Sequence, residues 1–378
     1  MIDSKKGLQE LVDRALEVDA VALDTEFVWE RTYYPRLGLI QIALSDEDCY
    51  LIDPCSISDL SPLGRLLESD RVIKILHDAP QDLAILRQAT GADAKNIFDT
   101  RLAAGFAGFT ATISLAKLLQ ELLDINLAKT ETRTNWLRRP LKRKQELYAM
   151  DDVRYLRAAR VLLLGHMVNN EVRGWLAEDL QRLDDPNFYA GISDDKRYLK
   201  VKGNTSLSRE SLAILQDLCR WREKEARERN RPRGHIIADR VLLPIAREKL
   251  TDRTAIVNSG PISEKCVSRY GATLKNLVEK GLARPKDELP PSLRNKRLKN
   301  REKITLQEIH EFIILKSDVL GIDPIVVGSN AELREFILTP PHKQRLPIVN
   351  KFSGWRGPFL LEILSSLDNR STKKTAAA

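Results

Sequence analysis

The stretch VALDTEF at residues 21–27 has the pattern of a β-strand, because apolar or β-branched residues alternate with small or acidic ones. Side chains on a strand alternate between its two faces, so Asp24 and Glu26 share one face. The other face carries Val21, Leu23, Thr25 and Phe27. The Cα atoms of the two acids lie roughly 6.5–7 Å apart, which lets both carboxylates serve one metal cluster. Taken alone, the pattern also describes a strand with one acidic face in water.

Two other acidic positions are candidates for the same site. Asp82 lies in HDAPQDLAIL at residues 77–86, in the expected first turn of a helix, where an acid also complements the helix dipole. Tyr148 and Asp152 are four residues apart on a helix predicted from Arg143 to Met167, so they share a face. That spacing is equally typical of a half-buried helix. His77 either faces the same region or is hydrogen-bonded within its loop.

The bulk composition indicates a soluble protein of two or three domains: 378 residues, 43% hydrophobic and 30% charged. The first residues lack the apolar core of a signal peptide, and no apolar run is long enough to span a bilayer. Four scattered cysteines without a CxxC pair argue against a disulfide scaffold or a zinc knuckle. We therefore expect a cytoplasmic protein with no membrane contact.

The charge is divided unequally along the chain. Residues 1–195 carry a net charge of −8, whereas residues 196–378 carry +16. A basic half of this size predicts a nucleic-acid partner, and an acidic half acting on that partner would need cations. The alternative is two charged surfaces with no partner.

The order of predicted elements indicates a mixed sheet. Three strands joined by short connections predict an antiparallel meander, and the alternation of helix and strand that follows predicts parallel pairing. The predicted strands are 21–27, 37–45, 49–53, 72–76 and 96–98, and the predicted helices are 4–18, 60–69, 81–90, 113–123 and 143–167.

A basic stretch precedes the last of these helices. Residues 129–144, KTETRTNWLRRPLKRK, hold seven basic residues against one acidic one, with Trp136 in the middle. Basic and aromatic residues together can contact phosphates and stack on bases. Trp136 can equally belong to the core, with the cations in water, and the sequence does not decide between these two.

The basic half has a different organisation. Residues 207–282 are predicted to be helical throughout, and residues 304–367 form a second helical segment. We divide the chain into a first domain (1–183), a linker (184–206), a helical domain (207–285), a basic linker (286–303), a second helical domain (304–370) and a frayed tail (371–378).

Several fragments together resemble one known family. LGLIQIA, KILHDAPQDLAIL, FDTRLAAGF, TRTNWLRRPL and YAMDDVRYL resemble the catalytic domain of the ribonuclease D family, in the Tyr-bearing branch of the DEDD exonuclease superfamily. The resemblance covers about residues 1–170. It implies an α/β ribonuclease H-like fold of the DnaQ-type 3′→5′ exonucleases, which is a mixed five-stranded sheet with flanking helices. Two all-α HRDC-like domains are expected to follow.

The same resemblance assigns roles to the candidate residues. It implies that Asp24 bridges two divalent metal ions, Mg²⁺ or Mn²⁺, that Glu26 and Asp152 hold the nucleophile-side ion, and that Asp82 supports the other through water. Tyr148 would hold the attacking water. Four carboxylates this close repel one another strongly, so the cluster makes physical sense as a cation site. Asp99, in FDT, would have a structural role.

The fragment LCRWREKEARERNRPRGHIIAD at residues 218–239 resembles an HRDC domain. Its tail RNRPR is predicted to have no acidic partner and is a candidate RNA contact. HRDC modules bind nucleic acid in some proteins and protein partners in others, so the resemblance leaves their task open. The candidate substrate contacts across the chain are Gln41, His77, Arg133, Arg138, Arg231 and Arg233.

These observations predict a metal-dependent 3′→5′ exoribonuclease that trims tRNA precursors and other structured RNAs and releases 5′-mononucleotides, acting as a monomer. Two alternatives belong to other classes. One is a non-catalytic RNA-binding protein on an exonuclease scaffold, and the other is a DNA exonuclease of the Werner or proofreading kind. The first would lack one of the acids or Tyr148, and all five residues are present.

Overall fold

The computed structural model describes residues 1–127, 134–258, 260, 262–293, 298–338, 352 and 354–362. The chain forms two compact units. The first unit comprises residues 1–27, 37–190 and those from 298 onward, and the second comprises residues 28–36 and 191–297. None of the helices within the described residues has both the length and the apolar character needed to cross a membrane.

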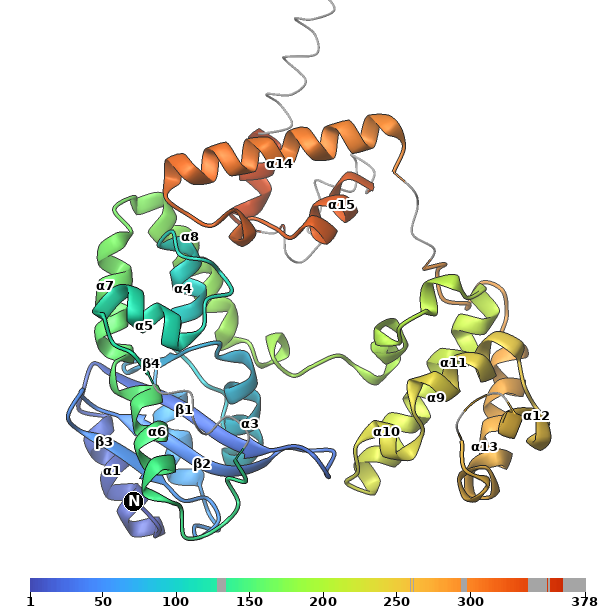
Figure 1. The fold of residues 1–378 in the computed structure, drawn as a ribbon, viewed down its shortest axis with the longest axis horizontal. Coiled ribbons are helices and arrows are strands. Elements are labelled where there is room, and N and C mark those ends of the chain that lie inside the picture. The colour runs from blue at the N-terminus through green and yellow to red at the C-terminus, as the bar shows by residue number, and fades with distance from the viewer. Residues whose placement is uncertain are drawn as a thin grey trace, which may run out of the picture. The chain divides into compact units, whose positions relative to one another are not determined.

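The first unit is built on a five-stranded mixed sheet, as predicted (Figure 1). The strands follow the order β3-β2-β1-β4-β5, so the strand that carries Asp24 and Glu26 is central. β2 pairs with β3 antiparallel, whereas β1–β4 and β4–β5 are parallel. Their bounds are β1 Ala20–Val28, β2 Arg36–Ala43, β3 Cys49–Ile52, β4 Ile73–Leu76 and β5 Ile97–Asp99.

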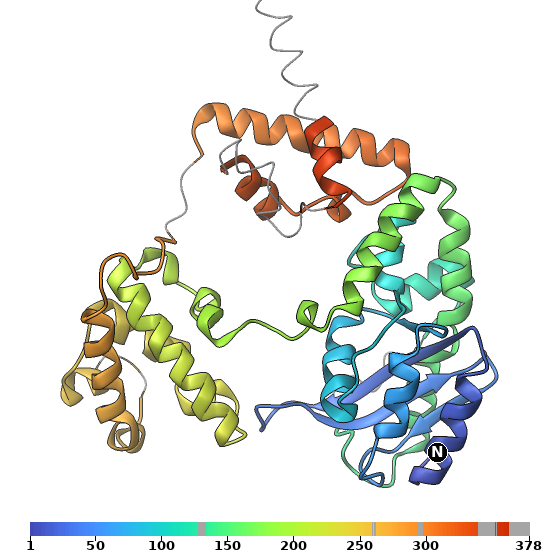
Figure 2. The same ribbon diagram turned by 180° about the vertical axis from the view of Figure 1, so that it is seen from behind.

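Helices cover both faces of the sheet (Figures 1 and 2). Val21 and Leu23 of β1 pack in one buried cluster with the apolar residues of α1 (Lys5–Ala15), α2 (Ser61–Glu68) and α3 (Pro80–Thr90). Ala20 and Ala22 instead pack with α4 (Thr100–Phe106), α5 (Leu115–Leu123) and the helices that follow. The alternation along β1, which the sequence pattern predicted, separates two hydrophobic layers.

The helix predicted from Arg143 to Met167 is wrong in one respect, because it is two helices. α6 (Arg143–Arg154) and α7 (Leu156–His166) are separated by Tyr155, whose φ of −100° and ψ of 0° depart from helical values. α6 packs on β3, whereas α7 packs on α4, α5 and β4. The two helices pack against different neighbours, and the break at Tyr155 allows the change of direction that this requires. α8 (Asn170–Gln181) and two 3₁₀ turns, Arg182–Asp184 and Pro186–Phe188, complete this region.

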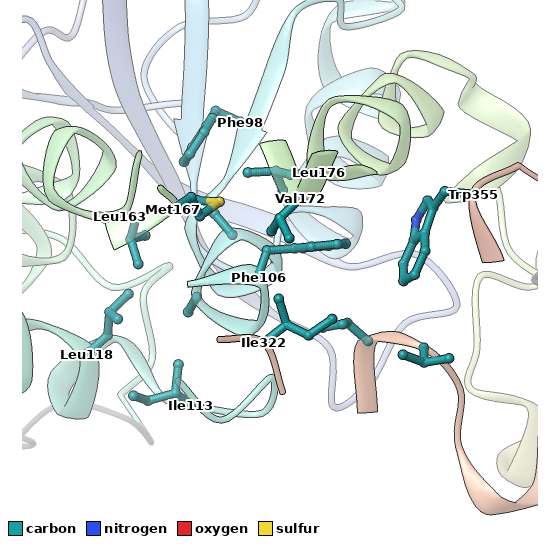
Figure 3. Close-up of a cluster of buried hydrophobic side chains, with 14 of the residues drawn as sticks. Phe98, Phe106, Ile113, Leu118, Leu163, Met167, Val172, Leu176, Ile322 and Trp355 are labelled. Atoms are coloured by element: carbon teal, nitrogen blue, oxygen red, sulfur yellow. The ribbon is translucent and has the colours of Figure 1, made fainter. Parts of the chain in front are cut away.

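The segment after residue 298 shares a core with the helices that follow the sheet. It contains α14 (Asn300–Leu320), a 3₁₀ turn (Pro324–Val326), α15 (Asn330–Leu338) and residues 354–362. Figure 3 shows Ile322 and Trp355 of this segment beside Phe106 of α4 and Val172 of α8. The Trp355 ring stacks on Trp175, with ring centroids 4.5 Å apart.

A buried ion pair reinforces this contact. Both nitrogens at the end of the Arg356 guanidinium donate to the two carboxylate oxygens of Asp179 on α8, at 2.6 Å each. Each side chain is only 4% exposed. The Nε of Arg356 donates to the Val326 carbonyl at 2.8 Å. The independent second helical domain at 304–370 stays a prediction, and its residues 339–351, 353 and 363–370, together with the tail 371–378, lie outside the described residues.

The second unit is helical, as predicted. Its helices are α9 (Arg209–Glu228), α10 (Arg233–Ile236), α11 (Asp239–Glu248), α12 (Arg253–Asn258) and α13 (Glu264–Leu282), preceded by 3₁₀ segments at Asp194–Lys200 and Asn204–Ser206. Tyr198 and Val201, in the segment interpreted as a linker, are buried in this core. The exact domain limits stay a prediction.

Candidate active site

Three carboxylates from two elements converge on one face of the sheet. Asp24 and Glu26 project from central strand β1, and Asp152 projects from α6. One carboxylate oxygen of each lies within 4.8 Å of the other two. All three side chains are partly buried. Residues far apart in sequence therefore present a compact set of oxygen donors.

Asp82, the fourth acid, is held by a residue that sequence reasoning did not single out. α3 begins at Pro80, and the Asp82 side chain accepts a hydrogen bond from the Thr25 hydroxyl. Asp82 is not among the three carboxylates grouped above, but burial first and then the charge of Asp82 raise the pKa of both Asp24 and Glu26. The signal for Thr25 was its place between the two acids, on the β1 face that α3 covers.

Asp99 fixes the turn that leads into α3. Its carboxylate accepts backbone N–H bonds from Asp78 at 3.1 Å and Ala79 at 2.9 Å, and it also caps α4 through Arg101 N at 2.8 Å. Asp78 has a φ of 67°, a left-handed conformation that needs local support. Asp99 thus stabilises the backbone that places Asp82, which is the structural role the resemblance implied.

Tyr148 lies one helical turn before Asp152 on α6. A hydrogen bond from its hydroxyl favours the ionised form of Asp152. Burial first, and then the charges of Asp152, Glu26 and Asp24, raise the pKa of the phenol above its ordinary value. The Tyr148 ring packs beside Trp136, with centroids 6.2 Å apart. The phenol therefore keeps its proton at neutral pH and acts as a hydrogen-bond donor.

The acids of the cluster hold their protons unusually tightly in the metal-free protein. Burial, reinforced by the charges of Asp152 and Asp82, raises the pKa of Glu26 to about 8. Burial is also the main reason that the pKa of Asp82 and that of Asp152 rise to about 7, and the pKa of Asp24 rises as well. A bound cation would remove this penalty. An all-oxygen donor set without thiol or imidazole fits Mg²⁺ or Mn²⁺.

These shifts predict opposite effects of pH on the metal-free and metal-bound protein. A carboxyl whose pKa is higher in the folded state stabilises the fold only while it is protonated. Without metal, the free energy of unfolding should fall as pH rises from about 4, where free carboxyls ionise, to about 8, the pKa of Glu26. Divalent ions bind the ionised form, so Mg²⁺ should raise the Tm more at about pH 8 than at about pH 5. Calorimetry in EDTA and in Mg²⁺ measures both, and equal metal-induced shifts at the two pH values would contradict the prediction.

Gln41 supports Asp24 from the neighbouring strand. It is fully buried on β2, and its side-chain amide donates to Asp24 Oδ2 at 3.4 Å. Its Oε1 has no hydrogen-bond partner among the described residues. This places Gln41 beside the acidic cluster, where it orients Asp24, and direct contact with substrate stays a prediction.

His77 is bonded within its own surroundings, which is one of the two alternatives left open by the sequence. Nδ1 lies 2.9 Å from the Thr100 hydroxyl, and Nε2 lies 3.1 Å from the Ile113 carbonyl. Burial lowers the pKa of the imidazole. Both ring nitrogens are therefore engaged, and the ring supports the turn between β4 and α3.

Comparison with known proteins settles the family. A 3′-5′ exonuclease family model matches residues 1–163, and an HRDC domain model matches residues 211–278. Ribonuclease D of Desulfotalea psychrophila is 51% identical over 360 residues, which cover 95% of this chain and 96% of the relative. The chain belongs to the ribonuclease D family. Ribonuclease D of Escherichia coli is 32% identical over 97% of each chain.

A solved structure agrees with this assignment. The crystal structure of Escherichia coli RNase D matches with a TM-score of 0.83 and 31% identity, and covers 98% of each chain. This ribonuclease D-family protein is therefore a 3′→5′ exoribonuclease with the exonuclease sheet and a helical HRDC region. The predicted family, fold class and enzyme class are confirmed.

Two residues of the basic stretch at 129–144 have structural roles in this ribonuclease D-family enzyme. Trp136 is 2% exposed and packs against β2, where Gly38 leaves room, because a Cβ there would lie 2.8 Å from that of Trp136. Arg139 is bound to Asp53, with Nε 2.8 Å from Oδ2. Trp136 thus belongs to the core. Arg138 is exposed and stays a candidate RNA contact, whereas Arg133 lies outside the described residues.

The two arginines proposed in the HRDC region differ. Arg233 is paired with Glu223, with Nε 2.5 Å from Oε1, and its guanidinium lies 5.0 Å from the centre of the Tyr33 ring. The prediction that RNRPR lacks an acidic partner is therefore wrong for Arg233, and also for Arg229, which pairs with Glu225 within the second unit. Arg231 is exposed. RNA contact by either residue stays a prediction.

Proposed function

We propose that this ribonuclease D-family enzyme trims the 3′ ends of structured RNA precursors, with tRNA 3′ tails as its main substrate, and releases 5′-mononucleotides. The observation that supports this most is the convergence of Asp24, Glu26 and Asp152 beside Tyr148. The Escherichia coli relative is described as an exoribonuclease involved in structured RNA processing. We further infer that the enzyme acts as a monomer in the cytoplasm, with its cysteines unpaired.

The residues divide the work of hydrolysis between them. Asp24, Glu26 and Asp152 would hold divalent cations, with Asp82 supporting them through water. Such cations offset the charge of the phosphodiester and generate a hydroxide nucleophile at neutral pH. Tyr148 donates a hydrogen bond that orients the attacking water. Thr25, Gln41 and Asp99 keep the acids in place.

The substitution Tyr148→Phe tests the role of the hydroxyl in orienting the attacking water separately from the role of the ring in packing. The ring stays, so its contact with Trp136 is kept, but the hydroxyl near Asp152 is lost. We expect kcat to fall by on the order of tenfold to a hundredfold, with RNA affinity nearly unchanged. Tyr155→Phe, which removes a hydroxyl at the break between α6 and α7, is the matched control. Equal losses of rate and affinity in Tyr148→Phe would show that the phenol is structural.

A time course tests the proposed substrate. 3′-Extended tRNA and a matched single-stranded DNA are incubated with Mg²⁺, with Mn²⁺ or with EDTA. We expect stepwise loss of 3′ nucleotides from the RNA with either metal, 5′-mononucleotides as product, and no reaction in EDTA. Equal or faster degradation of the DNA would favour the DNA exonuclease alternative, and binding without any hydrolysis would favour the non-catalytic one. Size-exclusion chromatography with light scattering tests the monomer.

A further inference from the structure

The cations at the end of α9 are not equivalent. Residues 220–233 contain seven basic side chains, and the structure pairs six of them with carboxylates within the second unit: Arg220, Arg222, Lys224, Arg227, Arg229 and Arg233. Arg231 has no carboxylate partner among the residues that the structure describes. It therefore offers a free guanidinium, while its neighbours stabilise the fold.

Arg231 lines a basic cavity of about 600 Å³. Its lining residues come from the end of α9, from α10 and from α13, and α9 contacts both of the other helices. The basic residues that line it are Arg229, Arg231, His235, Lys265 and Arg269, and no acidic side chain lines it. These five side chains are exposed, so the cavity opens to water. The volume lies in the range of ligand-binding cavities and accommodates a nucleotide unit with its solvent.

Two cations at the start of α13 are arranged unfavourably for the isolated protein. Lys265 and Arg269 are four residues apart and share a face, where like charges repel. Neither has a carboxylate partner within the described part of the chain. A bound anion would relieve this repulsion. The cavity wall is fixed independently, because Glu225 holds both Arg229 and the Tyr270 hydroxyl, the latter at 3.0 Å.

We propose that this cavity binds phosphate groups of the RNA substrate and holds the body of the RNA while its 3′ end is trimmed. The inference rests on the proposed RNA-trimming function. Guanidinium groups form paired, charge-assisted hydrogen bonds to phosphate oxygens, and a lysine adds a point charge. The cavity thus gives the basic half of the chain a defined RNA-binding site built from three helices. Arg231 was already a predicted RNA contact, and the cavity adds His235, Lys265 and Arg269.

The test compares two charge-matched double variants. Arg231→Ala with Lys265→Ala removes two cations of the cavity. Arg240→Ala with Lys280→Ala removes two exposed cations of α11 and α13 that do not line it. Affinity for 3′-extended tRNA is measured in Ca²⁺ over a range of salt concentrations. We expect the cavity variant to bind roughly tenfold more weakly, with the slope of log K against log salt shallower by about one to two, and the control to bind normally.

Equal losses of RNA affinity in both double variants would overturn the inference, and so would an unchanged salt slope in the cavity variant. The affinity for a 5′-mononucleotide is measured as well, and a cavity variant that loses this affinity but keeps its RNA affinity would also overturn the inference. The last would assign the cavity to free nucleotides. Arg231→Lys with Lys265→Arg keeps the charge and should restore RNA binding, which separates lost charge from misfolding. Hydrolysis of a short single-stranded RNA should stay normal in the cavity variant. Failure of the wild-type enzyme to hydrolyse any RNA would instead refute the proposed function.

Discussion

Asp24→Asn is expected to lower the rate of RNA hydrolysis by at least about a thousandfold, while RNA binding in Ca²⁺ persists. Asp24 is the acid whose pKa responds to all three others, Asp82, Asp152 and Glu26, so it lies at the electrostatic centre of the cluster. An amide cannot supply the charge that holds divalent cations. The Asn side chain still offers an oxygen that can accept the hydrogen bond from the Gln41 amide, so the local fold should survive.

The same substitution should raise the stability of the metal-free protein. Burial, reinforced by the charges of Asp82, Asp152 and Glu26, raises the pKa of Asp24, and a neutral amide at this position removes that electrostatic penalty. Asp151→Asn is the matched control on α6, because Asp151 pairs with Arg154 instead of joining the three carboxylates. Turnover near the wild-type rate in Asp24→Asn would end the catalytic assignment. A lower Tm in EDTA would show that the change damages the fold.

Arg356→Ala is expected to destabilise the first unit by about 3 kcal/mol. The substitution removes one partner of a buried ion pair and leaves Asp179 without its bidentate guanidinium. Arg182 is a second cation near Asp179, but its Nη1 lies 3.8 Å from Oδ1 and is poorly placed to compensate. Arg356 also lies over the Trp355 ring, 4.4 Å from its centre, so packing is lost as well.

Urea unfolding measures this loss. Lys6→Ala is the control, because it removes a cation from an exposed pair with Glu10 on α1 and should change stability little. A second variant, Asp179→Asn with Arg356→Met, replaces both charges and should cost less than Arg356→Ala, since no uncompensated charge is left buried. If Arg356→Ala and Lys6→Ala had equal effects, the contact between α8 and the residues near 356 would not contribute to stability.

The periodicity of strands and helices was enough to predict which of the candidate catalytic side chains share a face. Alternation along β1 placed Asp24 and Glu26 on one face, and the four-residue spacing placed Tyr148 beside Asp152. The mixed sheet followed from the order of strands and helices. These features depend on residues close together in sequence, where strand and helix geometry fixes side-chain direction.

Features that depend on distant contacts were not predictable in this way. The hydrogen bond from Thr25 to Asp82 exists because α3 docks on one particular face of β1. The break at Tyr155 reflects the different neighbours of α6 and α7, and no Gly or Pro marks it. Arg231 and Arg233 look alike in sequence, yet only Arg233 meets the buried Glu223. Composition predicted that the second half of the chain is basic, but it could not predict which of its cations pair with carboxylates in the folded protein.

The shared core of the first unit bears on when the enzyme can mature during synthesis. Phe106 and Trp175 emerge from the ribosome long before Trp355, which covers them. A nascent chain that has completed the sheet and all its acids still exposes this aromatic surface, because the residues that bury it are translated after the whole second unit. Final packing of this aromatic core is thereby postponed until the residues after the second unit have been translated.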